Sequence, residues 1–265
     1  MIKEINLNKM WLARVALLAL ATLPCANAQE KVSFPGRDGV ALNAKLYRPA
    51  GTGPFAAIVA MHGCGGPWKA RDDDWSGRLQ AAGYIVLFPD SFGSRGMGPQ
   101  CNVRERIMTS KDRAEDAFAS AEWLASRPDV VKGKIGLLGW SNGGTAVLSA
   151  SRSIRAPVGV EFRQAIAFYP GCSVFSEQSY RARVPLTILH GLADDWTPAE
   201  PCKSLSGVTF VGYPEAYHDF DHPNLAVKTR KAAVSANGSG IVTVGTNSEA
   251  RAQAIARTMS LFSRM

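Results

Sequence analysis

Short apolar segments alternate with amphipathic ones along most of the chain, a pattern typical of a mostly parallel sheet covered by helices on both faces. Helices are predicted near residues 73–82, 112–126, 145–150 and 248–262. In the segment 112–126, the apolar residues fall on one side of the predicted helix. The segments 91–102 and 221–245 lack such a pattern and are predicted to be loops. We therefore predict one α/β domain over residues 29–265, with strands near 31–34, 41–47, 55–61, 84–88, 135–138, 164–168, 184–189 and 209–213.

One apolar run turns directly into a helical one at Gly139-Trp140-Ser141-Asn142-Gly143-Gly144. A strand that becomes a helix at once must bend sharply, and glycines on both sides of the serine let neighbouring chain pack close. The hydroxyl of Ser141 is then held at the carboxyl end of a strand, above a helix N-terminus. An ordinary Gly-Ser turn would fit the glycines alone, but the flanking strand and helix favour a nucleophile.

A serine nucleophile needs a base within hydrogen-bond reach. Of the four histidines in the chain, His218 follows the last predicted strand, late in the sequence. This agrees with the order serine, acid, histidine that is used when a nucleophile stands on such a turn. We predict His218 as the base, with His222 as the alternative, and structural roles for His62 and His190.

The base needs an acid to orient it, and the reaction needs donors for a developing oxyanion. Asp194 and Asp195 both follow a strand end; the loop composition favours Asp194, and Asp195 stays an alternative. The backbone N–H of Asn142, directly after the serine, is one predicted oxyanion donor. The N–H of Cys64, in a glycine-rich loop after an apolar strand, is the other.

Residues 1–28 predict a cleavable signal peptide. Basic residues flank the apolar run 15–23, which is too short for a stable membrane anchor, and small residues precede the expected cleavage after Ala28. A lipoprotein signal at Cys25 is a poorer alternative, because a Leu-Pro pair precedes it. The mature protein would begin at Gln29 and be periplasmic or secreted, without a stable membrane anchor.

Composition is that of an ordinary globular protein, with 46% hydrophobic and 20% charged residues. Removal of three basic residues and one acidic residue with the leader lowers the formal net charge from +8 to +6. Because this charge is scattered, we expect no nucleic-acid binding. No His, Cys or Asp cluster has metal-ligand spacing, so no metal or other cofactor is expected. An oxidising compartment favours disulfides among Cys64, Cys101, Cys172 and Cys202.

Four motifs in order resemble those of the dienelactone hydrolase family of α/β-hydrolases: His62-Gly63-Cys64-Gly65-Gly66, Gly139-Trp140-Ser141-Asn142-Gly143-Gly144, Gly191-Leu192-Ala193-Asp194 and Ala216-Tyr217-His218-Asp219-Phe220. The likeness runs from about residue 31 to the end of the chain. It implies an α/β-hydrolase fold and a catalytic triad of Ser141, Asp194 and His218. The namesake enzymes carry a cysteine nucleophile where this chain has a serine, which favours a general carboxylesterase over an enzyme for dienelactone itself.

The resemblance and the predicted topology together imply the disulfides Cys172–Cys202 and Cys64–Cys101, each next to a catalytic loop. The resemblance also implies a serine hydrolase that cleaves small carboxylic esters or lactones through an acyl-enzyme intermediate, and the predicted signal peptide makes it an exported one. Two alternatives stay open. One is a peptidase of the same fold, and the other is an exported binding protein without turnover.

Overall fold

The computed structural model describes residues 29–152 and 160–265, together with Met1. The predicted signal peptide, apart from Met1, lies outside the described residues. Within the described ranges, none of the helices combines the length and the apolar character needed to span a bilayer.

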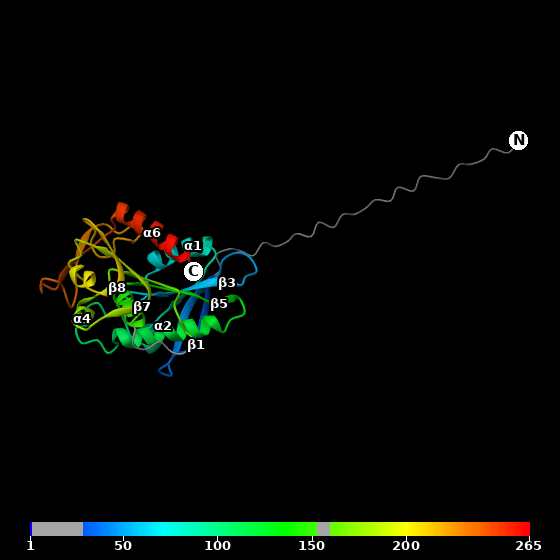
Figure 1. Ribbon diagram of the computed structural model, residues 1–265, viewed down its shortest axis with the longest axis horizontal. Helices are drawn as coiled ribbons and strands as arrows, with labels where there is room; N and C mark the ends of the chain where they lie inside the picture. Colours follow the sequence, from blue (N-terminus) through cyan, green and yellow to red (C-terminus); the bar gives the residue numbers. More distant parts are fainter. Residues whose placement is uncertain (2–28, 153–159) are drawn as a thin grey trace.

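An eight-stranded sheet in the order β1-β2-β4-β3-β5-β6-β7-β8 forms the centre of the molecule (Figure 1). From β4 to β8 all neighbouring strands are parallel, whereas β2 pairs antiparallel with both β1 and β4. This confirms the predicted α/β class with a mostly parallel sheet. The strands are β1 (Gln29–Pro35), β2 (Ala41–Tyr47), β3 (Phe55–Met61), β4 (Ile85–Pro89), β5 (Val130–Trp140), β6 (Gln164–Phe168), β7 (Arg181–Gly191) and β8 (Ser206–Tyr213).

Helices cover both faces of the sheet (Figure 1). The helices α1 (Lys69–Ala81) and α6 (Ser248–Phe262) pack on one face, and α2 (Ser110–Ala125) and α3 (Asn142–Ala150) pack on the other. Alternate residues of β3 serve the two faces: Val59 belongs to the core under α2 and α3, and Ile58 to the core under α1 and α6. Three further helices are short: η1 (Gly93–Arg95), α4 (Ser173–Ser176) and α5 (Glu200–Lys203).

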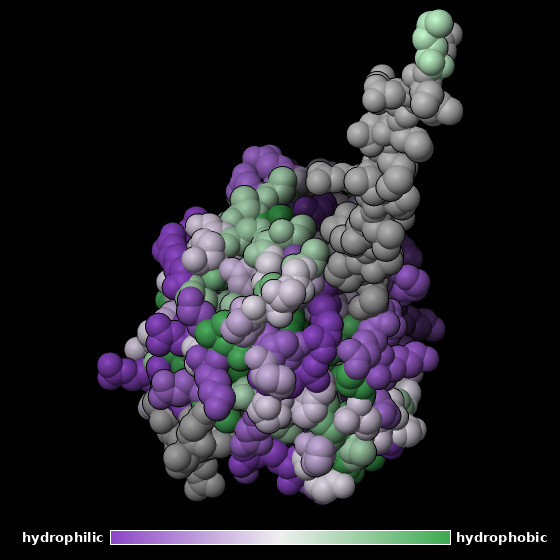
Figure 2. All heavy atoms as spheres, turned by 90° about the vertical axis from the view of Figure 1, so that its right-hand side faces the viewer, coloured by the Kyte–Doolittle hydropathy of each residue, from purple (hydrophilic) through white to green (hydrophobic). Residues whose placement is uncertain are grey.

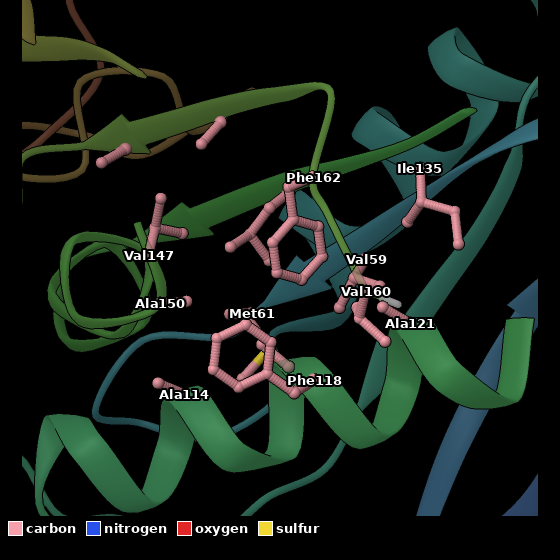
Figure 3. Packing of buried hydrophobic residues seen from close by; sticks show 14 of the residues in the cluster. Val59, Met61, Ala114, Phe118, Ala121, Ile135, Val147, Ala150, Val160 and Phe162 are labelled. Atoms are coloured by element: carbon pink, nitrogen blue, oxygen red, sulfur yellow. The ribbon is translucent and has the colours of Figure 1, made fainter. Parts of the chain in front are cut away.

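The amphipathic stripe of α2 lies where the sequence places it. Ala114, Phe118 and Ala121 are buried against strand residues such as Val59, and Figure 3 shows this packing together with Phe162. The helix begins with a capping box, in which Thr109 and Asp112 each accept a hydrogen bond from the other's backbone N–H. Local capping and apolar periodicity therefore specify the same helix.

The register of the sheet aligns the ends of three strands. Trp140 of β5 pairs with Phe168 of β6, which pairs with Leu189 of β7. The residues that follow these strands therefore emerge side by side at one edge of the sheet. In parallel sheets this carboxyl edge is where ligands bind.

The segment 221–245 is not irregular throughout, which corrects the expectation from sequence. It contains β9 (Lys228–Lys231) and β10 (Ile241–Val244), which pair antiparallel as a separate two-stranded sheet, drawn in orange at the left of Figure 1. Val242 and Val244 are buried against Cys64, Cys101 and Trp196. Each strand has only four residues, too few for the alternation of apolar and polar positions to stand out in the sequence.

Hydrophilic and hydrophobic side chains are interspersed over the face of the molecule seen in Figure 2. Several aliphatic side chains are nevertheless well exposed, among them Val103, Val174 and Val234. These three line a single cavity, which is described below.

Candidate active site

Ser141 stands at the bend between β5 and α3, with φ at +53°, in the left-handed region that non-glycine residues rarely adopt. Its N–H donates to the carbonyl oxygen of Phe168 at 2.9 Å, which fastens the bend to β6. The neighbouring glycines are required by space, because a Cβ at Gly143 would lie 2.1 Å from the carbonyl oxygen of Met61. The motif thus forms a strained strand-to-helix turn that presents a side chain over a helix N-terminus.

His218 follows β8 and lies between Ser141 and Asp194. Its Nε2 is 2.9 Å from Oγ of Ser141, and its Nδ1 is 2.7 Å from Oδ2 of Asp194. All three residues are buried; the serine, at 7% exposure, is the most accessible of them. With the carboxylate accepting at Nδ1, that nitrogen carries the hydrogen and Nε2 can accept from the serine hydroxyl. The structure therefore brings together three residues that are far apart in sequence.

The charges of this group favour an ionised acid beside a basic imidazole. Burial by itself raises the pKa of Asp194, but the imidazole of His218 and nearby N–H donors outweigh it, so the pKa lies below its usual 3.8. Two backbone N–H groups and the hydroxyl of Thr197 donate to this carboxylate. Burial lowers the pKa of His218, yet Asp194 first, and then Asp219 and Asp221, raise it above 6.5. A proton arriving on His218 is thus stabilised by nearby carboxylates.

Asp195, the alternative acid, makes a different contact. Its carboxylate accepts hydrogen bonds from the N–H of Thr243 at 2.7 Å and from the hydroxyl of the same residue at 2.8 Å. It therefore connects β10 to the loop after β7, beside the site. Of the two carboxylates that the sequence left open, the structure places Asp194 against His218.

The other three histidines have separate contacts. His62 accepts from a backbone N–H through Nε2 and is fully buried. His190 lies against a backbone carbonyl, and the ring of His222 is tilted by 38° against that of Trp68, with the centroids 4.2 Å apart. All four histidines fall within the described ranges, and only His218 has a hydrogen bond to the serine.

The two predicted oxyanion donors both border Ser141. Asn142 is the first residue of α3, where an N–H has no acceptor within the helix, and the Nη1 of Arg113 donates to its side-chain oxygen at 2.6 Å. Cys64 lies in the turn after β3, and its carbonyl oxygen accepts from the N–H of Gln100 at 2.7 Å. Among the described residues, neither Asn142 N–H nor Cys64 N–H has a hydrogen-bond acceptor.

Both disulfides have the pairing expected from the sequence. Cys64 is bonded to Cys101, which joins the turn after β3 to the long loop before α2. Cys172 is bonded to Cys202, which joins the segment after β6 to α5. The first bridge therefore lies at the candidate oxyanion donor, and the second braces a segment next to the site.

Two cavities meet at the serine and share Cys64, Ser141 and Trp196. The histidine cavity, of about 340 Å³, is the one that His218 lines. The amide cavity, of about 480 Å³, is the one that Asn142 lines, and His218 does not border it. Ser141 therefore lies at the junction of two spaces, each in the size range of small-molecule sites.

A buried carboxylate that sequence reasoning did not single out lies behind the site. Asp221 is fully buried and accepts hydrogen bonds from Nε1 of Trp75 and Nε1 of Trp140, both at 2.8 Å, and from the hydroxyl of Tyr169 at 2.5 Å. Trp140 directly precedes the serine, and the ring of Tyr169 lies 4.5 Å from that of His218. In the sequence, the only indication that Asp221 belongs to the site is its position three residues after His218.

Among the described residues, no group of three or more His, Cys, Asp or Glu side chains is arranged to hold a metal ion. A histidine and, through it, a carboxylate are joined to the serine hydroxyl by hydrogen bonds, and Asn142 and Cys64 line a cavity with the serine. This set of groups can activate a hydroxyl and stabilise a negatively charged oxygen beside it.

Comparison with known proteins agrees with this geometry. The model of the dienelactone hydrolase family matches residues 42–265. The chain is also 25% identical over 245 residues to the uncharacterized peptidase YuxL of Bacillus subtilis (strain 168), a match that covers 75% of this chain. The chain spans only 37% of the length of that relative.

Solved structures share the fold at low sequence identity. A dienelactone hydrolase-like promiscuous phosphotriesterase from metagenomic libraries is 18% identical, with a TM-score of 0.65 over 91% of this chain and 99% of that one. Thermogutta terrifontis esterase 2 is 19% identical, with a TM-score of 0.60 over 90% of this chain and 95% of that one. The predicted α/β-hydrolase fold is thereby confirmed.

Proposed function

Because the chain belongs to the dienelactone hydrolase family, we propose that it is a serine hydrolase that cleaves carboxylic esters or lactones of small molecules through an acyl-enzyme intermediate. One observation carries the proposal: hydrogen bonds run without a break from Asp194 through the ring of His218 to Ser141, at 2.7 and 2.9 Å. A binding protein without turnover has no need of this arrangement. The nucleophile is a serine, so the hydroxyl depends on His218 for activation.

In the first half of the reaction, Oγ of Ser141 attacks the ester carbonyl carbon while Nε2 of His218 takes the hydroxyl proton. The N–H groups of Cys64 and Asn142 donate to the oxyanion that forms. The bond to the alcohol oxygen then breaks, and His218 gives its proton to that oxygen. Asp194 stabilises the imidazolium between these two proton transfers.

In the second half, water attacks the acyl group on Ser141, and His218 takes a proton from the water. Collapse of the second tetrahedral intermediate releases the carboxylic acid, and the proton returns to Oγ of Ser141. The net reaction consumes one water molecule and regenerates the free hydroxyl.

Substitution of the nucleophile tests the proposal. We expect S141A to lower kcat for p-nitrophenyl butyrate on the order of 10⁴-fold or more, since the hydroxyl that forms the intermediate is lost. S149A is a matched control, because Ser149 lies in the same helix α3 and lines neither cavity. Hydrolysis by S141A at the wild-type rate would refute the assignment.

Two further assays separate the rival functions. A fluorophosphonate probe should label the wild-type protein but not S141A, whereas a binding protein without turnover would leave both unlabelled. Peptidyl p-nitroanilides test the peptidase alternative. The Bacillus subtilis relative is described as a peptidase, and this supports testing it. We expect ester hydrolysis to exceed peptide hydrolysis, and the reverse order would favour the peptidase.

We also propose that residues 1–28 direct export and are removed, which leaves a periplasmic or secreted enzyme with two disulfides. Support comes from the two bridges, which are typical of proteins in oxidising compartments. The mass of the protein from an exporting bacterial host should correspond to residues 29–265. A retained leader, or four free thiols in the denatured, unreduced protein, would contradict this.

A further inference from the structure

The two cavities that meet at Ser141 differ in their access to the base. In an ester, the alcohol oxygen must reach Nε2 of His218 to receive its proton, so the alcohol half has to lie on the side of that ring. His218 lines the histidine cavity and not the amide cavity. The alcohol half therefore occupies the histidine cavity. The acyl half extends into the amide cavity, past the N–H of Asn142.

The histidine cavity combines aromatic faces with unpaired polar groups of both signs. Arg71 is 3% exposed, its Nε has no hydrogen-bond partner among the described residues, and its one contact with a carboxylate, that of Asp72, is 3.5 Å long. Asp219 lines the same cavity, and no described residue donates a hydrogen bond to its carboxylate. Ring faces are supplied by Trp68 and Trp196.

The charged side chains that line the histidine cavity determine which kind of alcohol half can bind there. An anionic group would meet the carboxylate of Asp219, and a cationic group would meet the guanidinium groups of Arg71 and Arg230. A hydroxyl is both donor and acceptor, so a neutral polyol can give a hydrogen bond to Asp219 and accept one from Arg71. A ring that carries several hydroxyls would also present its less polar face to the tryptophans.

The amide cavity has a different lining. Val103, Val174 and Val234 are 37%, 60% and 54% exposed and lie around it with Pro198. Its volume of about 480 Å³ corresponds to roughly fifteen water molecules, far more than an acetyl group displaces. Burial of exposed valine surface by an apolar chain is favourable. Arg104 and Arg106 also line the cavity, so part of its surface stays polar.

We propose that the natural substrate is an acylated sugar, in which a polyhydroxylated ring occupies the histidine cavity and an apolar acyl chain longer than acetyl occupies the amide cavity. This inference rests on the proposed function and specifies its substrate. Hydrolysis breaks the bond between the acyl carbon and the sugar oxygen, and that oxygen takes the proton from His218. Water supplies the hydroxyl of the released fatty acid.

Two butanoate esters test the alcohol half on the wild-type enzyme. These are 6-O-butanoylglucose and cyclohexylmethyl butanoate, which share a six-membered ring and a CH₂–O linkage but differ in hydroxyls. We expect kcat/KM to be at least about tenfold higher for the sugar ester, because Arg71 and Asp219 stay unpaired with the cyclohexyl ring. Equal values, or a preference for the cyclohexyl ester, would overturn the proposal.

The outcome is distinct from that of the proposed function. If p-nitrophenyl butyrate is cleaved in a Ser141-dependent manner while the sugar ester shows no preference, the enzyme is an esterase and the sugar assignment is wrong. If neither ester nor the p-nitrophenyl compound is cleaved, the proposed function itself fails.

Selectivity ratios in two variants test which half lies in which cavity. W68A should lower the preference for the sugar ester over the cyclohexyl ester by about tenfold, and W68F, which keeps a ring face, should restore most of it. V174W fills part of the amide cavity and should lower the ratio of octanoyl to acetyl ester hydrolysis at least about tenfold. Rates are referred to fluorophosphonate-titrated sites, so that only folded enzyme counts. If W68A altered the acyl ratio and V174W the alcohol ratio, the assignment would be reversed.

Discussion

The floor and the wall of the site are built in different ways. The floor consists of Ser141, Asp194 and His218, which follow strands of one sheet, are almost fully buried, and are joined by hydrogen bonds. The wall consists of the turn after β3, the loop before α2 and the hairpin β9–β10. It is joined by the Cys64–Cys101 disulfide and by the contact of Asp195 with Thr243.

Under the proposed function, this difference separates reaction chemistry from substrate choice. Atoms fixed by strand register can be held within a few tenths of an ångström, which proton transfer requires. Loops around a sheet edge can change shape and charge without disturbing that register. Substitutions in the floor should therefore lower kcat for every ester, whereas substitutions in the wall should mainly change KM and the ratio between esters.

Asp194 and Asp195 give the sharpest form of this comparison, because they are adjacent in sequence but belong to floor and wall. We expect D194N to lower kcat about 10⁴-fold, since the amide no longer fixes the tautomer of His218 or stabilises its charged form. D195N keeps an oxygen that can accept from the N–H of Thr243, so its kcat should fall less than about tenfold. Steady-state kinetics on one p-nitrophenyl ester measure both. Equal losses would remove the distinction between floor and wall.

Asp221 is buried behind the residues of the floor, and we expect it to act as a positioning residue. It accepts hydrogen bonds from Trp140, which precedes Ser141, and from Tyr169, whose ring lies against that of His218. In D221N an amide N–H replaces one acceptor oxygen, so a donor of the cluster loses its partner. We expect kcat to fall between about 10- and 100-fold with a smaller change in KM.

The pH profile distinguishes this role from a merely structural one. Asp221 is one of the carboxylates that raise the pKa of His218, with Asp194 the strongest of them. D221N should therefore move the acid limb of the kcat/KM profile to lower pH, whereas Y169F keeps the carboxylate and should leave the limb in place. The charged and titratable groups that interact with His218 or Asp221 are Arg71, Asp194, Asp219, Tyr169, His190 and His222. A lower melting temperature of D221N with an unmoved limb would contradict the proposed role.

Most of the floor could be predicted from sequence. Each strand is an apolar run, and the order of serine, acid and histidine along the chain is that of the strands that carry them. The choice between Asp194 and Asp195 needed coordinates, because the directions of neighbouring side chains in a loop depend on backbone angles that the sequence does not specify. Asp221 was missed because its partners, Trp75 among them, lie up to 146 positions away and meet it only in the folded protein.

The wall was harder to predict. Residues 221–245 contain the hairpin β9–β10, whose strands have four residues each and whose buried positions, Val242 and Val244, are only two. So short an alternation does not rise above chance in a polar sequence. The strands are stabilised by tertiary contacts, with Asp195 and with the Cys64–Cys101 bridge, rather than by their own pattern.

The acid limb of the wild-type profile tests the electrostatics of the floor. Burial lowers the pKa of His218, but Asp194 and then Asp219 and Asp221 raise it above 6.5. The imidazole acts as a base only when it is neutral, so kcat/KM should fall about tenfold per pH unit below this raised pKa. We expect the limb to lie above pH 6.5 on a neutral ester. A limb at or below 6.5 would mean that the carboxylates do not outweigh burial.

The two disulfides give the smallest and most specific comparison, since one belongs to the wall and the other does not line either cavity. They span similar separations of 37 and 30 residues, so loss of either should cost about 2–4 kcal/mol of stability. Only C64S/C101S also frees the turn that carries the N–H of residue 64. At a temperature where both double variants are folded, C64S/C101S should therefore lose severalfold more kcat/KM than C172S/C202S. Urea denaturation and ester kinetics on the pair measure the two effects, and equal kinetic losses would show that the first bridge does not position the oxyanion donor.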